Sequence, residues 1–464
     1  MSRKFRPVLI AVVGLALPLL VVAIERGIET LGIAAAYKAK MLCSGIFVAN
    51  RNAIDVLREL EYDDLAPLRF IKTTVDHSDA RVYASAAGFI HRRAAYRPAG
   101  GCALVPRGTP IWRFQWEAVR DVPFTPREEI PLPSADSVYA GLDSVVARAF
   151  EEPDSTRLRR TQAVVVMQHG RIVAERYAPG ISPETRLLGW SMTKSVMNAL
   201  VGTLVRDGRI SLDEPVRLPE WSAPGDPRRA ITMRHLLHMT SGLRLNEVMN
   251  SLRSDVIRML LANDDMAAFV ASRDLIATPG SRWDYASGTT LIIARAIRSI
   301  LDNDSVYARY PRDALFDRIG MSSAIIETDA AGTLVGSSLM YATARDWARF
   351  GQLYLNDGMW DGERILPDGW VEFTRHPAPA DSNQSYGAHF WLSGPSEPGH
   401  PAGSPSERGL EAAGHEGQYL TILPSHDAVI VRLGRTRYGN AWNQATFVRE
   451  VVARLNAFAG SAVK

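Results

Sequence analysis

Residues 188–205 read LGWSMTKSVMNALVGTLV, and the interpretation of the whole chain starts from this stretch. Ser191 and Lys194 lie three positions apart at the start of an apolar segment with helical spacing. Residues three apart share one face of a helix, so the hydroxyl and the amine can meet. A helix N-terminus also carries partial positive charge, which favours the anion that a serine nucleophile passes through. We therefore expect a catalytic turn here.

The use of lysine supports this expectation. Arg does not release its proton in a protein, whereas a buried Lys can act as a base, so Lys at this position is informative in a chain that otherwise prefers Arg. The pattern Ser-x-x-Lys alone is short enough to recur by chance, as the terminal pair Ser461 and Lys464 illustrates. The lysines of the chain are Lys4, Lys38, Lys40, Lys72, Lys194 and Lys464.

Composition is that of a folded globular protein. The 464 residues are 46% hydrophobic and 22% charged, which leaves room for roughly two or three domains. The net charge of +3 comes from 53 cations and 50 anions scattered along the chain. Without a basic stripe, nucleic acid is not an expected partner.

The N-terminus has the pattern of a membrane anchor. Arg3, Lys4 and Arg6 precede an uncharged run, Pro7–Ile24, which is long enough to cross a bilayer. Its length favours an inner-membrane anchor over residues 1–26, with the remainder exported to the periplasm by the positive-inside rule. The alternative is a signal peptide cleaved at the alanines of residues 34–36, which would give a secreted protein.

Two cysteines follow the apolar run, Cys43 and Cys102. In an exported chain an isolated pair favours a disulfide over a metal or redox site. Two buried free thiols are the alternative.

Residues 27–135 are predicted to form a small β-containing appendage. Its expected elements are a strand at Lys40–Asn50, a helix at Asn52–Leu60 and a hairpin of Phe70–Val75 with Arg81–Ala87. A Pro-rich passage, Val122–Pro133, is the expected linker because repeated Pro prevents both helix and central strand.

Residues 136–464 are predicted to form one larger domain of the α/β (α+β) class. A helical pattern at Ser137–Phe150 and a closing helix at Trp442–Phe458 flank two hairpins, one over residues 163–178 and one over residues 419–433. Mostly helical sequence lies between the hairpins. This order indicates an antiparallel β-sheet built from both ends of the domain, flanked by helices, with an inserted helical region.

Two further stretches complete a candidate site. RWDYASG at residues 282–288 precedes an apolar helix and can place the Tyr285 phenol and the Ser287 hydroxyl beside a nucleophile. GHEGQ at residues 414–418 enters the last hairpin, where small residues let backbone N–H groups approach a substrate.

The ordered set Ser191-x-x-Lys194, Tyr285-x-Ser287 and His415-x-Gly417 resembles the serine β-lactamase-like hydrolases. The closest likeness is to the class C β-lactamase-related group, which includes 6-aminohexanoate-dimer hydrolases, carboxylesterases and D-alanyl-D-alanine carboxypeptidases. The likeness spans roughly residues 137–460 and includes HLLHMTSGL at 235–243 and GSSLMYATARDWARF at 336–350.

The resemblance implies roles for these residues. Ser191 would attack the carbonyl, Lys194 would take its proton, and Tyr285 would pass a proton to the leaving group and help activate water. The N–H groups of Ser191 and Gln418 would form the oxyanion hole, and Ser287 would orient Lys194 or contact substrate. The implied activity is hydrolysis of an ester or amide, peptide-like or small, without cofactor or metal.

Two departures concern substrate choice. Members that process β-lactams carry Lys where this chain has His415 and Asn where it has Ser287, so a permanent cation for a substrate carboxylate is missing. Glu416 adds an anion nearby. These differences favour a less anionic ester or amide. The alternative function is a non-hydrolysing, penicillin-binding-like envelope protein that is stably acylated by peptide-like ligands.

Several candidate residues also have plain structural interpretations. His235 and His238 are more readily explained by packing than by a metal, since no third ligand is evident. Tyr285 can be a core tyrosine, and His415 can be structural or face substrate. Trp190, Trp283 and Trp391 can line a pocket or fill the core. Oligomeric state is not indicated by the sequence.

Overall fold

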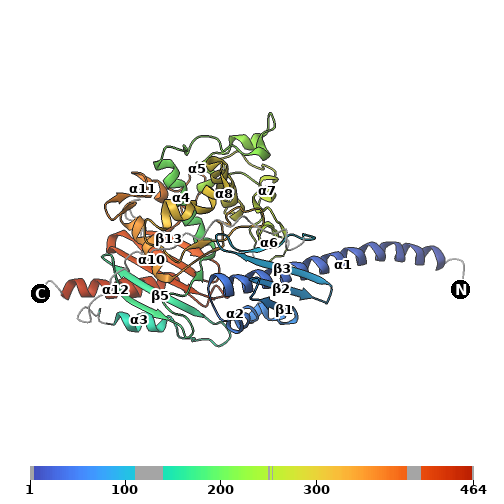
Figure 1. Ribbon diagram of the computed structural model, residues 1–464, viewed down its shortest axis with the longest axis horizontal. Helices are drawn as coiled ribbons and strands as arrows, with labels where there is room; N and C mark the ends of the chain where they lie inside the picture. Colours follow the sequence, from blue (N-terminus) through green and yellow to red (C-terminus); the bar gives the residue numbers. More distant parts are fainter. Residues whose placement is uncertain are drawn as a thin grey trace.

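The structure is a computed structural model that describes residues 5–109, 139, 141–248, 251–252, 254–393 and 409–461. Its centre is a six-stranded antiparallel sheet with the strand order β12-β13-β14-β15-β5-β6 (Figure 1). The strands are β5 Thr161–Gln168, β6 Arg171–Tyr177, β12 Trp391–Ser393, β13 Gly409–Gly414, β14 Gln418–Leu423 and β15 Ala428–Gly434.

The sheet joins the two ends of the larger domain. Strand β15 pairs with β5 in the register Val431↔Val165, although the two strands lie far apart in sequence. Both predicted hairpins, β5–β6 and β14–β15, are therefore confirmed, and the predicted α/β class with an antiparallel sheet is confirmed as well. Every residue of β5 and β15 is buried, which is the expected state of strands covered on both faces.

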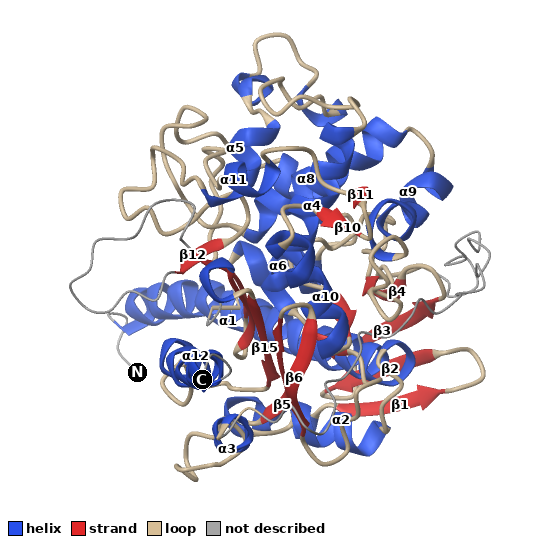
Figure 2. Ribbon diagram, turned by 90° about the vertical axis from the view of Figure 1, so that its left-hand side faces the viewer, coloured by secondary structure: helices blue, strands red, loops and turns tan. Residues whose placement is uncertain are grey.

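Helices cover both faces of this sheet. Helix α10 contacts β5, β14 and β15 on one face. On the other face α3 and α12 pack together over a separate apolar cluster that includes Val164, Val166 and Ile430. Figure 2 shows α3 and α12 beside β5 and β6. The bounds are α3 Leu142–Arg148, α10 Ala344–Leu355 and α12 Gln444–Ser461.

A helical region is inserted between β6 and β12, as the sequence predicts. It occupies the upper part of the molecule in Figure 1 and carries short strands within it. Its helices are α4 Thr193–Arg206, α5 Met233–Leu237, α6 Asp255–Ala262, α7 Met266–Ala271, α8 Ser287–Leu301, α9 Asp304–Pro311 and α11 Trp370–Arg375. Its strands are β7 Leu187–Leu188, β8 Ile325–Ile326, β9 Met340–Ala342, β10 Met359–Trp360 and β11 Glu363–Arg364.

The N-terminal part consists of one long helix and a four-stranded sheet. Helix α1, Phe5–Cys43, extends beyond the body at its N-terminal end and packs on β2 and β3 at its C-terminal end (Figure 1). The other elements are α2 Ala53–Leu60, β1 Lys72–Asp76, β2 Arg81–Ala86, β3 Ile90–Arg97 and β4 Gly101–Leu104. The predicted helix at 52–60 and the predicted hairpin are present as α2 and as β1 with β2.

The predicted strand at Lys40–Asn50 is wrong. Helix α1 continues through Cys43 and is followed by a π-helical turn, Ser44–Val48. Ala35, Ala36 and Ala39 are fully buried there, and such small side chains keep helix propensity high while letting the helix lie close to its neighbours. The apolar pattern of residues 41–48 belongs to the end of a buried helix, which periodicity alone does not separate from a short buried strand.

The N-terminal part shares a core with the rest of the molecule. Apolar residues of α1 and of the four-stranded sheet belong to the same buried cluster as those of α4 and α8. Lys40 forms a buried ion pair with Glu327, which also accepts hydrogen bonds from the Ser44 hydroxyl and the Cys102 backbone. A disulfide joins Cys43 to Cys102, as predicted. The predicted linker, Val122–Pro133, lies outside the described residues.

Among the described residues, one helical stretch, Leu20–Val48, is long and apolar enough to cross a membrane. Most of its tested window is buried inside the molecule, yet its first part exposes Leu20, Val21, Ile24 and Ile28. This helix is compatible with a membrane anchor or a signal sequence, and the disulfide fits a location outside the cytoplasm.

Candidate active site

The turn that carries Ser191 lies between β7 and α4. Residues Trp190–Met192 form a 3₁₀ turn that runs directly into α4. Trp190 has φ of 48°, a left-handed conformation that is strained for a bulky residue and is often kept at functional sites. At Gly189 a Cβ would lie 2.5 Å from the Trp347 ring, so a larger residue would move the turn.

Lys194 is held by three oxygen atoms. Its Nζ lies 2.9 Å from Ser191 Oγ, 3.0 Å from Ser287 Oγ and 2.9 Å from the Ser337 carbonyl oxygen. The Lys194 side chain is buried, whereas Ser191 is partly exposed. The structure therefore combines an accessible hydroxyl with an enclosed amine.

Ser287 links Lys194 to an acidic residue that the sequence interpretation missed. The Ser287 hydroxyl donates a short hydrogen bond to Glu247 while it receives one from Lys194. Ser287 begins α8 and Glu247 lies in the loop before α6, so helix periodicity could not relate the two. In the sequence Glu247 is one acidic residue among many, and no motif marks it.

Tyr285 lies beside Lys194 in a group of aromatic side chains. The Lys194 Nζ is 4.9 Å from the Tyr285 ring centroid. Trp391 stacks against Tyr285, and Tyr386 and Trp283 complete the group through ring contacts of 4.9–6.4 Å. Trp283 and Trp391 thus form a wall next to Tyr285, while Tyr386 is fully buried behind it.

The third motif, His415-x-Gly417, approaches the site from the central sheet. His415 is exposed, and its ring meets the Trp190 ring edge to face at 5.5 Å. Gly417 has φ of 77°, and a Cβ there would lie 2.4 Å from Arg432, so this turn requires glycine. The Gln418 carboxamide forms two hydrogen bonds with the Gly434 backbone. Its Nε2 donates to the Gly434 carbonyl oxygen at 2.6 Å, and its Oε1 accepts from the Gly434 N–H at 3.0 Å.

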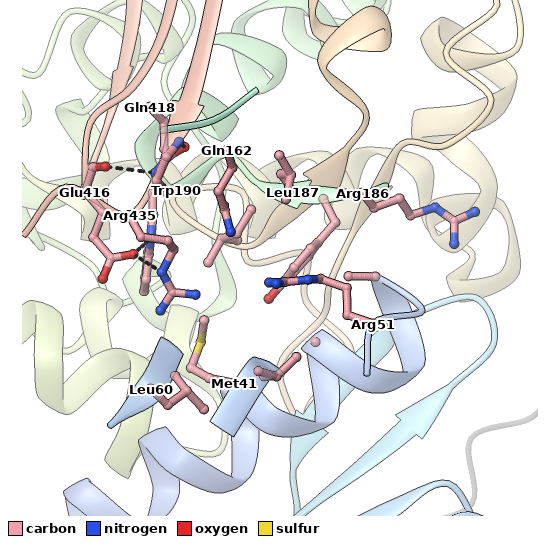
Figure 3. A pocket seen from close by; sticks show the side chains of 16 residues that line it. Met41, Arg51, Leu60, Gln162, Arg186, Leu187, Trp190, Glu416, Gln418 and Arg435 are labelled. Atoms are coloured by element: carbon pink, nitrogen blue, oxygen red, sulfur yellow. Dashed lines mark hydrogen bonds and ion pairs between the residues drawn. The ribbon is translucent and has the colours of Figure 1, made fainter. Parts of the chain in front are cut away.

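Glu416 is buried behind the turn, and Figure 3 shows its carboxylate beside Arg435 and Trp190. Arg435 and Arg437 approach its carboxylate to 3.0 and 2.6 Å. Burial alone raises the pKa of Glu416, but Arg435, His415, Arg437 and the Trp190 indole together hold it below its usual range. The sequence placed an anion near the site at Glu416, and the structure shows that this anion is neutralised by two ion pairs.

His389 is a second residue that the sequence did not reveal. Its ring bonds the Leu237 carbonyl oxygen at 2.7 Å through Nδ1 and the Thr290 hydroxyl at 2.9 Å through Nε2. The Ser195 hydroxyl bonds its backbone oxygen at 2.7 Å. Burial lowers the pKa of His389 to about 3, so the ring is neutral and ties α4 to α5 and α8.

The two other histidines singled out in the sequence lie in α5 and just after it. His235 Nδ1 accepts a hydrogen bond from the Thr232 backbone and completes a capping box. His238 packs edge to face on Phe373, and burial lowers its pKa to about 4. Both positions fit the packing interpretation given above.

The structure therefore brings Ser191, Lys194, Tyr285 and Ser287 into one cluster. Strands β13 and β14 contact the 3₁₀ turn, so the third motif adjoins this cluster. Chemically, the arrangement places a hydroxyl, an enclosed amine and a phenol beside the central sheet.

Comparisons with known proteins identify one matching family model and several similar proteins. The family model described as Beta-lactamase matches residues 146–453. The 6-aminohexanoate-dimer hydrolase of Paenarthrobacter ureafaciens is 27% identical over 320 residues, which cover 63% of this chain and 77% of that protein.

Two solved structures share the fold at low sequence identity. EstCE1, a hydrolase with promiscuous acyltransferase activity, has a TM-score of 0.55 at 16% identity, covering 69% of this chain and 98% of its own. The penicillin binding protein from Bacillus halodurans has a TM-score of 0.51 at 15% identity, covering 68% and 99%.

Proposed function

The chain belongs to the beta-lactamase family, and from this premise we propose that it is a serine hydrolase that cleaves an ester or amide through an acyl-enzyme intermediate. One observation carries the proposal: the buried Lys194 amine lies 2.9 Å from the partly exposed Ser191 hydroxyl. An amine that donates its two N–H bonds to Ser287 and Ser337 keeps its lone pair for the Ser191 proton.

In the first half of the proposed reaction, Ser191 Oγ forms a bond to the substrate carbonyl carbon while its proton passes to Lys194. The oxyanion is stabilised by the N–H groups of Ser191 and Gln418, and each such donor contributes about 3–4 kcal/mol to lowering the barrier. Tyr285 then delivers a proton to the leaving oxygen or nitrogen as the carbonyl bond to that atom breaks.

In the second half, a water molecule replaces the leaving group. Tyr285, which gave up its proton in the first half, takes the proton that water loses as the water oxygen attacks the acyl carbon, and Lys194 returns its proton to Ser191 Oγ as the ester bond to that oxygen breaks. The first half is reversed with water in place of the alcohol or amine, so the same residues serve both halves.

The proposed substrates are small esters or amides without an essential carboxylate. A relative named as a 6-aminohexanoate-dimer hydrolase supports amide substrates. His415 and Ser287 stand where β-lactam-processing relatives carry Lys and Asn, and Arg435 and Arg437 are already engaged by Glu416. We therefore expect slow turnover of β-lactams.

The proposed location is the outer face of the inner membrane, with residues 1–26 as anchor and residues 136–464 as the hydrolase domain. The basic residues before Pro7 support an orientation with the N-terminus in the cytoplasm. Protease treatment of spheroplasts tests it: the hydrolase domain should be digested from outside, and full protection would contradict the proposal.

Labelling with a fluorophosphonate probe tests the function. Ser191 is the expected site of label, and Ser191→Ala should abolish both label and hydrolysis of 4-nitrophenyl acetate. Hydrolysis that persists in Ser191→Ala refutes the proposal. A stable adduct on Ser191 without turnover would instead support the non-hydrolysing, penicillin-binding-like function.

A further inference from the structure

An apolar cavity of about 430 Å³ lies where α1, the segment 63–70 and α6 meet. Helices α1 and α6 are in direct contact beside it (Figure 1). Its walls are mainly branched aliphatic side chains from three separate segments. They include Ile33, Leu65, Leu68, Ile257 and Leu260, and Ala34 also lines the space.

The cavity adjoins the catalytic turn. Trp190 and His415 line it, and these are the residue before Ser191 and the first residue of the third motif. Leu339, which also lines it, follows Ser337 by two positions, and the Ser337 carbonyl oxygen holds Lys194. The cavity therefore lies beside the turn that carries Ser191.

The charged groups of this lining are already paired. Lys40 forms its buried ion pair with Glu327, and Arg437 is 2.6 Å from Glu416. An anionic or cationic chain in the cavity would lose its hydration without gaining a free partner of opposite charge. An uncharged aliphatic chain has no such hydration to lose, and its burial is favourable by about 0.8 kcal/mol per methylene.

The cavity also lies close to the apolar face of α1. Ile33 and Ala34 line the cavity, and exposed apolar residues such as Ile24 and Ile28 precede them on the same helix. A helix rises about 1.5 Å per residue, so about 14 Å separate the levels of Ile24 and Ile33 along its axis. A chain that leaves a bilayer surrounding the exposed part of α1 would reach the cavity directly. Leu252, which is 42% exposed, lies at its rim.

From these observations we propose that the cavity receives the aliphatic acyl chain of a lipid-like ester or amide that the enzyme takes from the membrane. The proposal rests on the serine hydrolase function and specifies its substrate class. The N-terminal segment 27–109 then forms part of the substrate site, because α1 and the segment 63–70 supply half of the cavity wall.

The test measures chain-length preference in the full-length protein held in phospholipid nanodiscs. The substrates are 4-nitrophenyl acetate, butanoate and octanoate, and the quantity is the ratio of kcat/KM for octanoate to that for acetate. Each methylene that enters the cavity should raise kcat/KM about four-fold. Ala34→Phe, which fills the cavity without removing packing atoms, should lower the ratio about sixteen-fold if it excludes two methylenes.

A second variant and a control protect the test against misfolding. Leu252→Ser alters the exposed rim and should also lower the ratio, whereas Val306→Ser, an equally exposed site on α9, should leave it unchanged. If kcat/KM does not depend on chain length, or if the ratio is unchanged in both cavity variants, the acyl-chain proposal is wrong. In that case Ser191-dependent hydrolysis of the acetate would still support the serine hydrolase function. If Ser191→Ala retains full activity, both the acyl-chain proposal and the serine hydrolase proposal are wrong.

Discussion

The ring of Tyr285 stacks on the ring of Trp391, with centroids 5.5 Å apart and planes inclined by 23°. Tyr285 precedes α8 and Trp391 begins the edge strand β12, so the contact joins the inserted helical region to the central sheet. Tyr386 closes the group, edge-on to both rings. The position of the Tyr285 phenol relative to Lys194 thus depends on packing as well as on its own loop.

This packing allows the hydroxyl of Tyr285 to be tested apart from its ring. Tyr285→Phe keeps the stacking and removes the proton relay, so kcat should fall by about 10²–10⁴-fold, the usual contribution of a general acid or base. Tyr386→Phe is the matched control, since it also removes a phenol from the same aromatic group. Equal losses in the two variants would mean that packing, not proton transfer, explains the role of Tyr285.

Lys194→Arg tests the identity of the base. Arg stays protonated and so cannot accept the Ser191 proton, and its larger head does not fit a site that is 1% exposed. Labelling of Ser191 by fluorophosphonate should become undetectable, while Lys72→Arg on exposed β1 should label as the wild type does. Normal labelling of Lys194→Arg would exclude Lys194 as the base.

Much of the central fold was predictable because its signals are local. The two hairpins have short turns such as His169-Gly170-Arg171, and their strands alternate or are continuously apolar. The end of α1 was mispredicted because its helical character depends on close packing against β2 and β3. Strands β3 and β4 were not predicted because apolar and polar residues alternate only weakly along them. The two strands pair with each other beside α1.

For the site, sequence order sufficed where residues belong to motifs. Ser191, Lys194, Tyr285 and Ser287 were named from short patterns, and the structure brings them together. Glu247, His389 and the arginines that pair with Glu416 carry no such pattern. They all lie in loops, and only the tertiary fold brings them near the turn that carries Ser191.

Glu416→Gln should destabilise the protein. Arg435 and Arg437 would keep their charges but lose their buried counter-ion, at a cost of about 3–5 kcal/mol at neutral pH. Because the folded-state pKa of Glu416 is depressed, its contribution exists above the unfolded pKa and is lost as pH falls through the folded pKa. Denaturant melts at several pH values should therefore show a difference that shrinks in acid, whereas exposed Glu372→Gln should show little difference at any pH.

Glu411 has a raised pKa, in contrast to Glu416. It lies on β13 between Trp391 and Thr421, and the Thr421 hydroxyl donates to its carboxylate at 3.0 Å. Burial raises the pKa of Glu411 to about 7, although the Thr421 bond acts in the other direction. The folded protein therefore keeps a proton on Glu411 at pH values where the unfolded chain, with a pKa of about 4.3, has released it.

Glu411→Gln should consequently stabilise the protein in alkali. Between pH of about 4.3 and 7 the folded state binds more protons than the unfolded state, so wild-type stability falls with rising pH by about 1.4 kcal/mol per unit from this group. Gln has the shape of the neutral acid and does not ionise. The variant should match the wild type near pH 4 and exceed it by on the order of 3–4 kcal/mol at pH 8. Denaturant unfolding at both pH values measures this, and an equal difference at the two would show that Glu411 does not titrate in this range.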